Sequence, residues 1–336
     1  MRTDIRNLTE ADLDTAARLL AAHHRADRTR APHLPARFEE PAAVRPLIER
    51  TLAQPLARGV AAIHGDQIAG FMIGTVALVA PTLWFTKFLP PRSGQIAYAG
   101  HAVAGEDGGE IERQMYAALA PHFIEHGCFT HFVEVSAGDD TALDAWFSLG
   151  FGQALTLAER DTSPLPDAAP VVSGVEIHRA GPEEIDGVME LNDHLARHHN
   201  ASPIFLPYLP ETAPHAREHQ LELLADPENA HWIAYRNGRP VGMQTFHAPR
   251  SAEMARPDKA IYLFQGVTAP GERGGGVGAA LLQHSLAWAR QAGYERCTLH
   301  YLAANIPGAR FWQRHGFRPL THDLVRRIDD RIAWAH

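Results

Sequence analysis

"PGERGGGVGAALL" spans residues 270–282, and four glycines fall within the five positions 274–278. A run suited to a strand, "KAIYLFQGVTA" (259–269), comes directly before it, and apolar residues at helical spacing follow it. The first turn of a helix carries backbone N–H groups without internal partners and about half a positive charge from the aligned peptides. Glycines let a ligand approach this backbone closely, and Arg273 adds a planar cation suited to phosphate oxygens. The pattern therefore predicts an anion site, in particular for a pyrophosphate.

The chain repeats itself with a period of roughly 170 residues. Matching positions are 172 apart early in each half and 166 apart later: Ile5 with Ile177, Gly70 with Gly242, Asp139 with Asn305, Trp146 with Trp312, and Phe151 with Phe317. The first half therefore contains six extra residues, which we place in the proline-containing loop near 80–95. A period of this length indicates a duplicated domain rather than a solenoid repeat.

Each half predicts a strand, one or two helices, a hairpin, a long strand, a glycine-bounded helix, a further strand and a short helix. This order favours a mixed α/β fold, α+β-like in character, with a mostly antiparallel sheet flanked by helices. The stretch 160–174 is rich in Pro, Ser, Asp and small residues, which is typical of a linker. We predict domains at 1–160 and 175–336, joined by a linker at 161–174.

Composition excludes several classes of protein. The 336 residues are 45% hydrophobic and 21% charged, as in a globular protein, and the net charge of −8 argues against a nucleic-acid binder. No apolar run approaches the ~18–20 residues of a membrane span, and the N-terminal stretch lacks a signal-peptide core. Cys128 and Cys297 form no disulfide framework, so we expect a cytoplasmic protein. His194 and His198 could share a metal, but the HExxH pattern is missing and we predict no metal.

Two nucleotide motifs compete for the glycine loop. Gly274-x-Gly276-x-x-Ala279 formally satisfies the dinucleotide fingerprint, but its half opens with strand–helix–hairpin, and no acidic residue ends the next strand, "CTLHYL". A P-loop is excluded because no GK[ST] follows the glycines. A glycine-rich surface turn without a ligand stays open as an alternative.

A third pattern uses more of the chain. Arg273-x-x-Gly276-x-Gly278, after a strand ending in "GVT" (266–268), resembles the acyl-CoA-binding motif of the GCN5-related N-acetyltransferase (GNAT) superfamily. A second signature of that superfamily is resembled by Asn305, Gly308, Phe311 and Gly316-Phe317. The resemblance covers 175–320 and recurs in weaker form over 3–155, so the chain is similar to a tandem GNAT protein. It implies two GNAT-type domains, each with a splayed parallel strand pair in its sheet.

The resemblance also implies how acetyl-CoA, or another acyl-CoA, is bound. Pantetheine is expected between the splayed strands, with a backbone N–H near Val267 polarising the thioester carbonyl. Residues 273–279 are expected to hold the pyrophosphate, and Asn305 to bind the pantetheine arm or orient its loop. The residues predicted to bind the co-substrate are Gly266, Val267, Thr268, Arg273, Gly274, Gly275, Gly276, Val277, Gly278, Ala279, Asn305 and Phe311.

The groups that move protons are less evident. An amine acceptor must lose a proton before it attacks, and many relatives use a glutamate on the central strand. Gln265 stands near that place here and cannot act as a base. Relatives often carry an acidic tyrosine seven positions after the asparagine, where this chain has Trp312. The catalytic candidates are therefore Tyr301, His300 and Gln265, with Tyr262 and His247 as further candidate bases.

The two halves differ at the glycine loop. The matching stretch of the first half is "GEDGGEIERQM" (105–115), in which Asp107, Glu110 and Glu112 replace Arg273, Gly276 and Gly278. Glu106 adds another carboxylate. Carboxylates stabilise an empty helix N-terminus but repel a pyrophosphate. We therefore predict that only the second half binds acyl-CoA and that the first is degenerate.

Several functions follow from these patterns. The leading hypothesis is an acyl-CoA-dependent N-acyltransferase with a small amine or peptide-like acceptor, bound by the segment 194–220. The protein would be a monomeric pseudo-dimer or a homodimer, without nucleic-acid or membrane partners. Alternatives are an inactive CoA-binding sensor or scaffold and, more distantly, a nicotinamide oxidoreductase.

Overall fold

The computed structural model describes residues 3–105, 107–165, 172–248 and 254–335, so Glu106 and the middle of the linker lie outside the described residues. The first half contains β1 (Thr3–Asn7), α1 (Leu13–Arg30), α2 (Pro41–Leu52), β2 (Arg58–His64), β3 (Gln67–Leu78), β4 (Arg92–Ile96), β5 (His101–Val103), α3 (Gly108–Glu125), β6 (Thr130–Ser136), α4 (Asp140–Ser148) and β7 (Gly152–Asp161). The second half contains β8 (Val175–Arg179), α5 (Ile185–Asn200), α6 (Ala213–Ala225), β9 (Ala230–Arg236), β10 (Arg239–His247), β11 (Ala260–Thr268), α7 (Val277–Gln291), β12 (Arg296–Leu302), α8 (Ile306–Arg314) and β13 (Arg318–Arg327). Short 3-10 helices are η1 (Glu10–Asp12), η2 (Ala36–Glu39), η3 (Trp84–Lys87), η4 (Tyr98–Gly100), η5 (Pro182–Glu184), η6 (Pro270–Glu272) and η7 (Asp330–Ala333).

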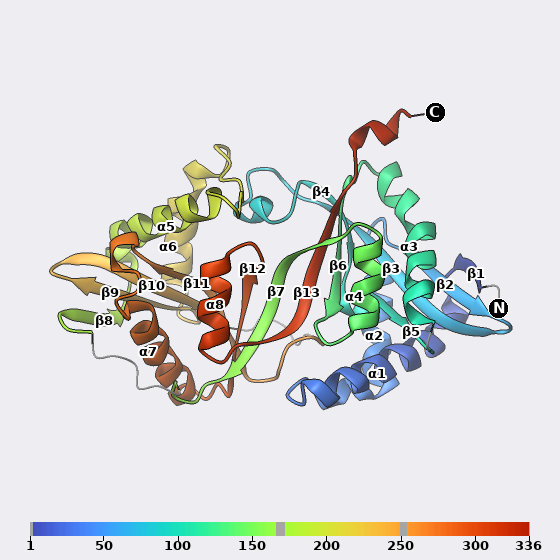
Figure 1. Ribbon diagram of the computed structural model, residues 1–336, viewed down its shortest axis with the longest axis horizontal. Helices are drawn as coiled ribbons and strands as arrows, with labels where there is room; N and C mark the ends of the chain where they lie inside the picture. Colours follow the sequence, from blue (N-terminus) through green and yellow to red (C-terminus); the bar gives the residue numbers. More distant parts are fainter. Residues whose placement is uncertain (1–2, 106, 166–171, 249–253, 336) are drawn as a thin grey trace.

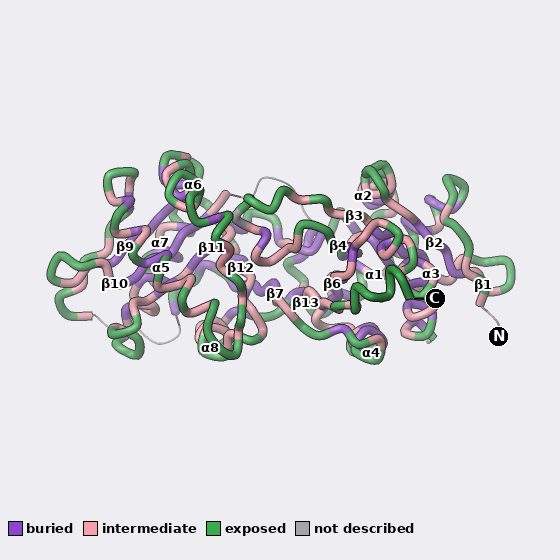
Figure 2. Tube along the Cα trace, turned by 90° about the horizontal axis from the view of Figure 1, so that it is seen from above, coloured by how far each residue is buried: buried purple, intermediate pink, exposed green. Residues whose placement is uncertain are grey.

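The strands form one continuous sheet along the long axis of the molecule. Its order is β1-β2-β3-β4-β6-β13-β7-β12-β11-β10-β9-β8, and β5 lies off this path against β3. Figure 1 shows the two halves at opposite ends, with β7 and β13 running side by side between them. Figure 2 shows the buried segments running along the middle of the molecule, with the outer turns of helices and loops exposed. The fold is the mixed α/β arrangement that the sequence predicts.

The internal repeat is confirmed element by element. The series β1 to β7 with α1 to α4 recurs as β8 to β13 with α5 to α8, except that β4 and β5 correspond to the single strand β11. The offset is 172 residues between β2 and β9 but 166 between β6 and β12. The extra residues of the first half therefore lie between β2 and β6, a stretch that includes the predicted loop near 80–95.

The last strand of each half is exchanged. β13 pairs antiparallel with β6 of the first half, and β7 pairs antiparallel with β12 of the second half. β7 and β13 also pair with each other, which joins the two half-sheets. Each half thus takes the strand that completes its sheet from the other half. The domain boundaries 1–160, 161–174 and 175–336 stay a prediction about the units of the duplication.

One strand pair in each half is parallel and splayed. β11 and β12 are paired only from Ala260 opposite Arg296 to Leu263 opposite Leu299, although both strands continue beyond this point. A β-bulge at Phe264, opposite the Thr245/Phe246 step of β10, bends β11 where the pairing with β12 ends. The predicted splay is therefore present, and it opens beside the glycine loop.

Local sequence signals explain the helix that follows the loop. Gly276 is the N-cap of α7 with a φ of 86°, and Gly293, with a φ of 87°, lies just past its end. Leu281, Leu282 and Leu286 are fully buried against the sheet. Among the described residues, we find no helix both long and apolar enough to cross a membrane.

A loop of the first half reaches the second half. The segment between β3 and β4 contains η3, and in Figure 1 it extends from β4 toward the helices α5 and α6. Phe88 from this segment lines a cavity of the second half. Lys87 lies close enough to His199 of α5 and His219 of α6 for its charge to lower their pKa values, in addition to the larger effect of burial.

Candidate active site

The glycine loop has the backbone geometry that an anion site needs. Gly274 and Gly276 have φ values of 80° and 86°, in the left-handed region that favours glycine. The backbone at Gly276 turns directly into the first turn of α7, whose N–H groups lack partners within the helix. The Arg273 side chain donates from Nε to the Thr268 carbonyl oxygen at 3.3 Å, which holds its guanidinium beside this turn.

A cavity of about 720 Å³ connects this loop to the splay between β11 and β12. All the residues predicted from the sequence as co-substrate-binding or catalytic line it, except Gly275. His247, a further candidate base, does not line it and stacks instead on Phe264, with ring centroids 4.5 Å apart. The segments 263–268, 273–279 and 299–311, far apart in sequence, thus meet around one cavity.

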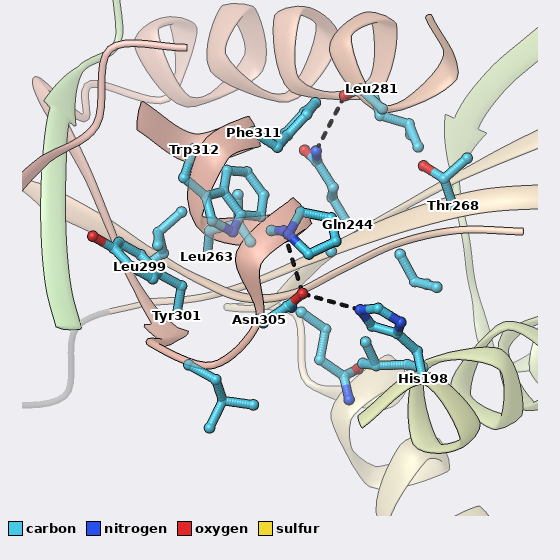
Figure 3. Close-up of a pocket in the computed structure, with 18 of the residues that line it drawn as sticks. His198, Gln244, Leu263, Thr268, Leu281, Leu299, Tyr301, Asn305, Phe311 and Trp312 are labelled. Atoms are coloured by element: carbon cyan, nitrogen blue, oxygen red, sulfur yellow. Dashed lines mark hydrogen bonds between the residues drawn. The ribbon is translucent and has the colours of Figure 1, made fainter. Parts of the chain in front are cut away.

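Glycines allow the walls of this cavity to pack closely. A Cβ at Gly266 would lie 3.0 Å from the Trp312 ring, and a Cβ at Gly278 would lie 3.3 Å from Thr268 Oγ1 and 3.4 Å from the Phe311 ring. Figure 3 shows Phe311 and Trp312 side by side on this wall. Side chains at Gly266 or Gly278 would therefore enter the space that the cavity occupies.

Asn305 connects two elements at the cavity. Its Oδ1 accepts a hydrogen bond from Gly308 N at 3.2 Å, which caps α8, and lies 3.0 Å from His198 Nε2 of α5 (Figure 3). The amide therefore fixes the start of α8 and ties it to α5. The role of Asn305 in binding the co-substrate stays a prediction.

The catalytic candidates lie on opposite faces of the sheet. Side chains alternate along a strand, so Tyr301 and His300 of β12 point to different sides. Tyr301 packs in the core beneath α7 and α8 and accepts a hydrogen bond from Gln313 Nε2 at 3.4 Å. Gln265 lies on the α5 side, where its Nε2 donates to Asn192 Oδ1 at 3.4 Å.

Gln265 has an unusual environment. Its side chain is 8% exposed, and its Oε1 has no hydrogen-bond partner among the described residues. Asn192 fixes the Nε2 end of the Gln265 amide, so Oε1 remains as a hydrogen-bond acceptor that no described residue satisfies. Gln265 is part of the cavity wall. A buried acceptor without a partner costs about 1–3 kcal/mol, and a bound N–H or O–H group would remove that cost.

A polar chain on the α5 side lines the same cavity. The Tyr262 hydroxyl lies 3.0 Å from His300 Nδ1, and His300 Nε2 lies 4.0 Å from Asp323 Oδ2. Burial, with a smaller effect from Arg256, lowers the pKa of His300 to about 3. Burial and the neighbouring Glu134 carboxylate raise the pKa of Asp323 to about 8, against a smaller opposing effect of Arg256. These shifts favour the neutral form of His300 and a carboxyl of Asp323 that holds its proton more tightly than an ordinary aspartate does.

Sequence reasoning missed Asp323, Asn192 and Phe88. Asp323 lies on β13, which β7 separates from β12 because the two strands are exchanged between the halves. Phe88 comes from the segment between β3 and β4 of the first half. No local motif marks either residue, since both line the cavity together with residues far away in sequence.

The corresponding place in the first half is filled by side chains. His101 pairs with Met72 of β3 as Gly266 pairs with Gln244 of β10, the residue 172 positions after Met72. Glu112 takes the place of Gly278, and its Oε1 lies 3.0 Å from His101 Nδ1. The other ring nitrogen of His101 lies 3.0 Å from the carbonyl oxygen of Glu134 on β6. The gap that is open between β11 and β12 is therefore bridged here.

Electrostatics support this bridge. Both side chains are almost fully buried, at 3% and 2% exposed. Burial alone lowers the pKa of His101, but the Glu112 carboxylate outweighs burial and the pKa is raised. The second carboxylate of this helix, Glu110, is exposed and pairs with Arg113 and Gln114. Two glycines in the second half are thus replaced by a buried ion pair in the first.

The described residues contain no group of three or more His, Cys, Asp or Glu side chains placed to hold a metal ion. His194 and His198 have other contacts, with Arg197 and Asn305 respectively.

Comparisons with known proteins agree with this geometry. Residues 196–317 match the family model described as "Acetyltransferase (GNAT) family". No curated protein sequence matches the chain. A GCN5-related N-acetyltransferase from Sphaerobacter thermophilus superposes with a TM-score of 0.58 at 16% identity, over 98% of this chain and 96% of that chain.

Two further solved structures resemble the chain. A GCN5-related glucosamine N-acetyltransferase region in a fungal multi-domain β-N-acetylglucosaminidase has a TM-score of 0.54 at 16% identity, over 96% of this chain and 38% of that chain. A tandem GNAT protein from the clavulanic acid biosynthesis pathway has a TM-score of 0.49 at 14% identity, over 97% of this chain and 98% of that chain. Residues 196–317 thus match the GNAT acetyltransferase family, and the chain as a whole has the fold of a GCN5-related N-acetyltransferase.

Proposed function

We propose that the protein is an acyl-CoA-dependent N-acyltransferase that uses acetyl-CoA and transfers the acyl group directly to a small amine or peptide-like acceptor. The observation that carries the proposal is the cavity that joins the glycine-bounded N-terminus of α7 to the open splay of β11 and β12. A helix N-terminus suits a pyrophosphate, and unpaired strand edges suit the amides of pantetheine.

Strand register suggests which backbone groups meet the thioester. Ala269 N donates to Val241 O, so the amide of Val267, two residues earlier, also faces β10. The amides of Gly266 and Thr268 then face the splay. The sequence predicts that an N–H near Val267 polarises the thioester carbonyl. We assign this role to the N–H of Gly266 or Thr268.

The acceptor side lies beneath α5. Leu195, His198 and His199 of the predicted segment 194–220 line the cavity there, and Phe88 of the first half adds an aromatic wall. Gln265 Oε1 has no hydrogen-bond partner in the part of the chain that the structure describes, and we propose that it accepts a hydrogen bond from an N–H group of the amine substrate. Tyr301, on the α7 and α8 side, remains the candidate acid for the departing thiolate.

Only the second half is proposed to be competent. In the first half the buried His101–Glu112 pair stands where Gly266 and Gly278 stand in the second half, and it puts a carboxylate on the helix equivalent to α7. Because the halves exchange strands, we treat 1–160 and 175–336 as units of duplication within one monomeric pseudo-dimer. Cys128 and Cys297 are free and buried, which suits the proposed cytoplasmic location.

Calorimetric titration of the full-length protein with acetyl-CoA tests the proposal about the halves. We expect one molecule bound per chain, and thioester consumption when an amine panel is added. A stoichiometry of two would contradict a degenerate first half.

The alternative is a CoA-binding sensor or scaffold without catalysis. It is favoured by Trp312, which stands where relatives often have an acidic tyrosine and packs against Gly266. Tight binding of acetyl-CoA without thioester consumption across the amine panel would support this alternative.

A further inference from the structure

We propose that Tyr262, His300 and Asp323 form a proton relay that deprotonates the acceptor amine, and that Glu134 of the first half positions its terminal carboxylate. The inference rests on the proposed function, since it requires an amine acceptor. It assigns a role to the first half beyond that of a degenerate copy.

Geometry places the three relay side chains on one wall of one cavity. Tyr262, His300 and Asp323 come from β11, β12 and β13, and each lines the cavity. His300 lies opposite Leu157 of β7, while Asp323 lies opposite Leu155, two residues away on the same face. The three relay side chains therefore run from the splay between β11 and β12, past β7, to β13 beside the sheet of the first half.

The relay requires one set of hydrogen-bond roles. Tyr262 Oη lies 3.0 Å from His300 Nδ1. In the proposed relay the Tyr262 O–H donates to Nδ1, and the proton of the neutral ring is then on Nε2. Nε2 faces Asp323 Oδ2 at 4.0 Å, a separation of the kind that tightens when a substrate binds. A proton entering at Tyr262 can therefore leave at Asp323.

The first half supplies the neighbour of the terminal carboxylate. Asp323 lies directly opposite Glu134 of β6 in the antiparallel pair, so the two carboxyl groups share a face of the sheet. Glu134 is fixed by Thr321 Oγ1, which donates to Oε1 at 2.9 Å, and by Tyr98 N, which donates to Oε2 at 3.3 Å. In addition to burial, the charge of the neighbouring Glu134 therefore raises the pKa of Asp323.

Four charged or titratable groups face Asp323 from the surrounding elements. They are Glu134 of β6, His300 of β12, Tyr262 of β11 and Arg256 of the segment before β11, whose guanidinium lies 5.0 Å from the centre of the Tyr262 ring. Glu134 and burial favour the protonated carboxyl, and Arg256 opposes them. The remaining exposure of the Asp323 side chain, 27%, allows the proton to reach water.

The step balances. The N–H bond of the ammonium acceptor breaks, Tyr262 takes the proton while passing its own to His300 Nδ1, and the Nε2 proton moves to the Asp323 carboxylate. The amine lone pair then attacks the thioester carbonyl carbon, and the C–S bond breaks. The second amine proton ends on the departing CoA sulfur, and Asp323 returns its proton to solvent.

Steady-state kinetics of the full-length protein over a range of pH tests the relay. We expect kcat of the wild type to rise with pH and level off above the pKa of Asp323, because the carboxyl must be ionised to accept a proton. Asp323→Asn should lower kcat by about 100-fold or more and remove this rising limb, with acetyl-CoA affinity unchanged by calorimetry. Asp329→Asn, an exposed carboxylate outside the cavity, is the matched control and should leave kcat within about 2-fold.

Glu134→Gln separates positioning from folding. Removing the like charge should shift the rising limb of kcat to lower pH while the plateau changes little, an effect that a merely structural role would not produce. Tyr262→Phe should lower kcat while binding of acetyl-CoA persists.

Failure of the relay and failure of the proposed function give different results. If Asp323→Asn keeps both kcat and the rising limb, the relay is wrong and the transferase proposal stands. If the wild type binds acetyl-CoA but consumes none with any amine, both are wrong and the sensor alternative is favoured.

Discussion

Gly278 and Glu112 occupy the same position in the two halves, and the difference between them decides whether a cavity forms. Gly278 leaves space beside Thr268 and Phe311, whereas Glu112 fills that space and pairs with His101. A hydrogen atom in place of a carboxylate therefore changes both the volume and the charge at the start of the helix. Position 278 is a sharper test than Gly276, because the positive φ of Gly276 strains any substitution.

Gly278→Glu tests this difference in the second half. We expect acetyl-CoA affinity to fall by about 100-fold or more, since a carboxylate at the cavity wall repels the pyrophosphate and occupies its space. Titration calorimetry measures the loss. Gly271→Glu is the matched control, because a Cβ there meets nothing within 4 Å and the residue does not line the cavity. Equal losses in both variants would mean that net charge, not the cradle, explains the effect.

At the scale of elements, the difference between a His–Glu pair in the first half and two glycines in the second changes how strands and helices are joined. In the first half His101 of β5 links α3 through Glu112 and β6 through the Glu134 carbonyl. In the second half β11 has no such bridge, and its outer part separates from β12. A buried ion pair thus replaces contacts that we expect a ligand to supply in the other copy.

Glu112→Gln should lower the free energy of unfolding by roughly 3 kcal/mol, because it removes one partner of a buried ion pair. The folded-state pKa of His101 is raised, so the pair stabilises fully below the unfolded pKa of about 6.5 and loses this effect as pH rises through the folded value. The difference between wild type and variant should therefore be larger at acidic than at alkaline pH. Denaturant unfolding at both pH values measures it.

The exposed Glu110 provides the comparison. Glu110→Gln should leave stability nearly unchanged at either pH, since its ion pair with Arg113 is at the surface and solvent screens it. A cost for Glu112→Gln that did not depend on pH would show that His101 is not charged in the fold.

At the scale of the whole molecule, strand exchange makes one sheet of two copies. β7 and β13 are the last strands of their halves and lie at the centre of the sheet, where β13 lies between two strands of the first half and β7 lies between two strands of the second half. The two halves therefore share hydrogen bonds that neither can make alone. The cavity of the second half is lined by Phe88 of the first half and by Asp323 of the exchanged strand β13.

Ligand binding in the second half should consequently stabilise the first half against unfolding. At a free acetyl-CoA concentration of 100 times Kd, stability rises by about 2.7 kcal/mol if only the native state binds. We expect hydrogen exchange of the slowest amides of β6 to slow along with those of β12, because one cooperative sheet contains both. Slowing confined to the second half would show that the halves unfold separately.

Much of the fold was evident from local patterns. The duplication, the splayed pair, the glycine loop and the helix bounded by Gly276 and Gly293 follow from residue spacing, since backbone geometry restricts which residues occupy turns and caps. The glycine loop and the Asn305 signature also led to the predicted co-substrate residues, eleven of which line the cavity together with the catalytic candidates Gln265, His300 and Tyr301. These features depend on neighbours in sequence.

The exchange of β7 and β13 and the contacts it creates were decided only by the tertiary structure. Pairing between strands of different halves leaves no mark in either strand, because each offers the same alternating pattern and backbone groups to any partner. The sequence by itself therefore determined two GNAT-type copies and a glycine cradle in one of them. Which strand completes which sheet, and hence the place of Asp323 beside His300, depended on the packing of the whole chain.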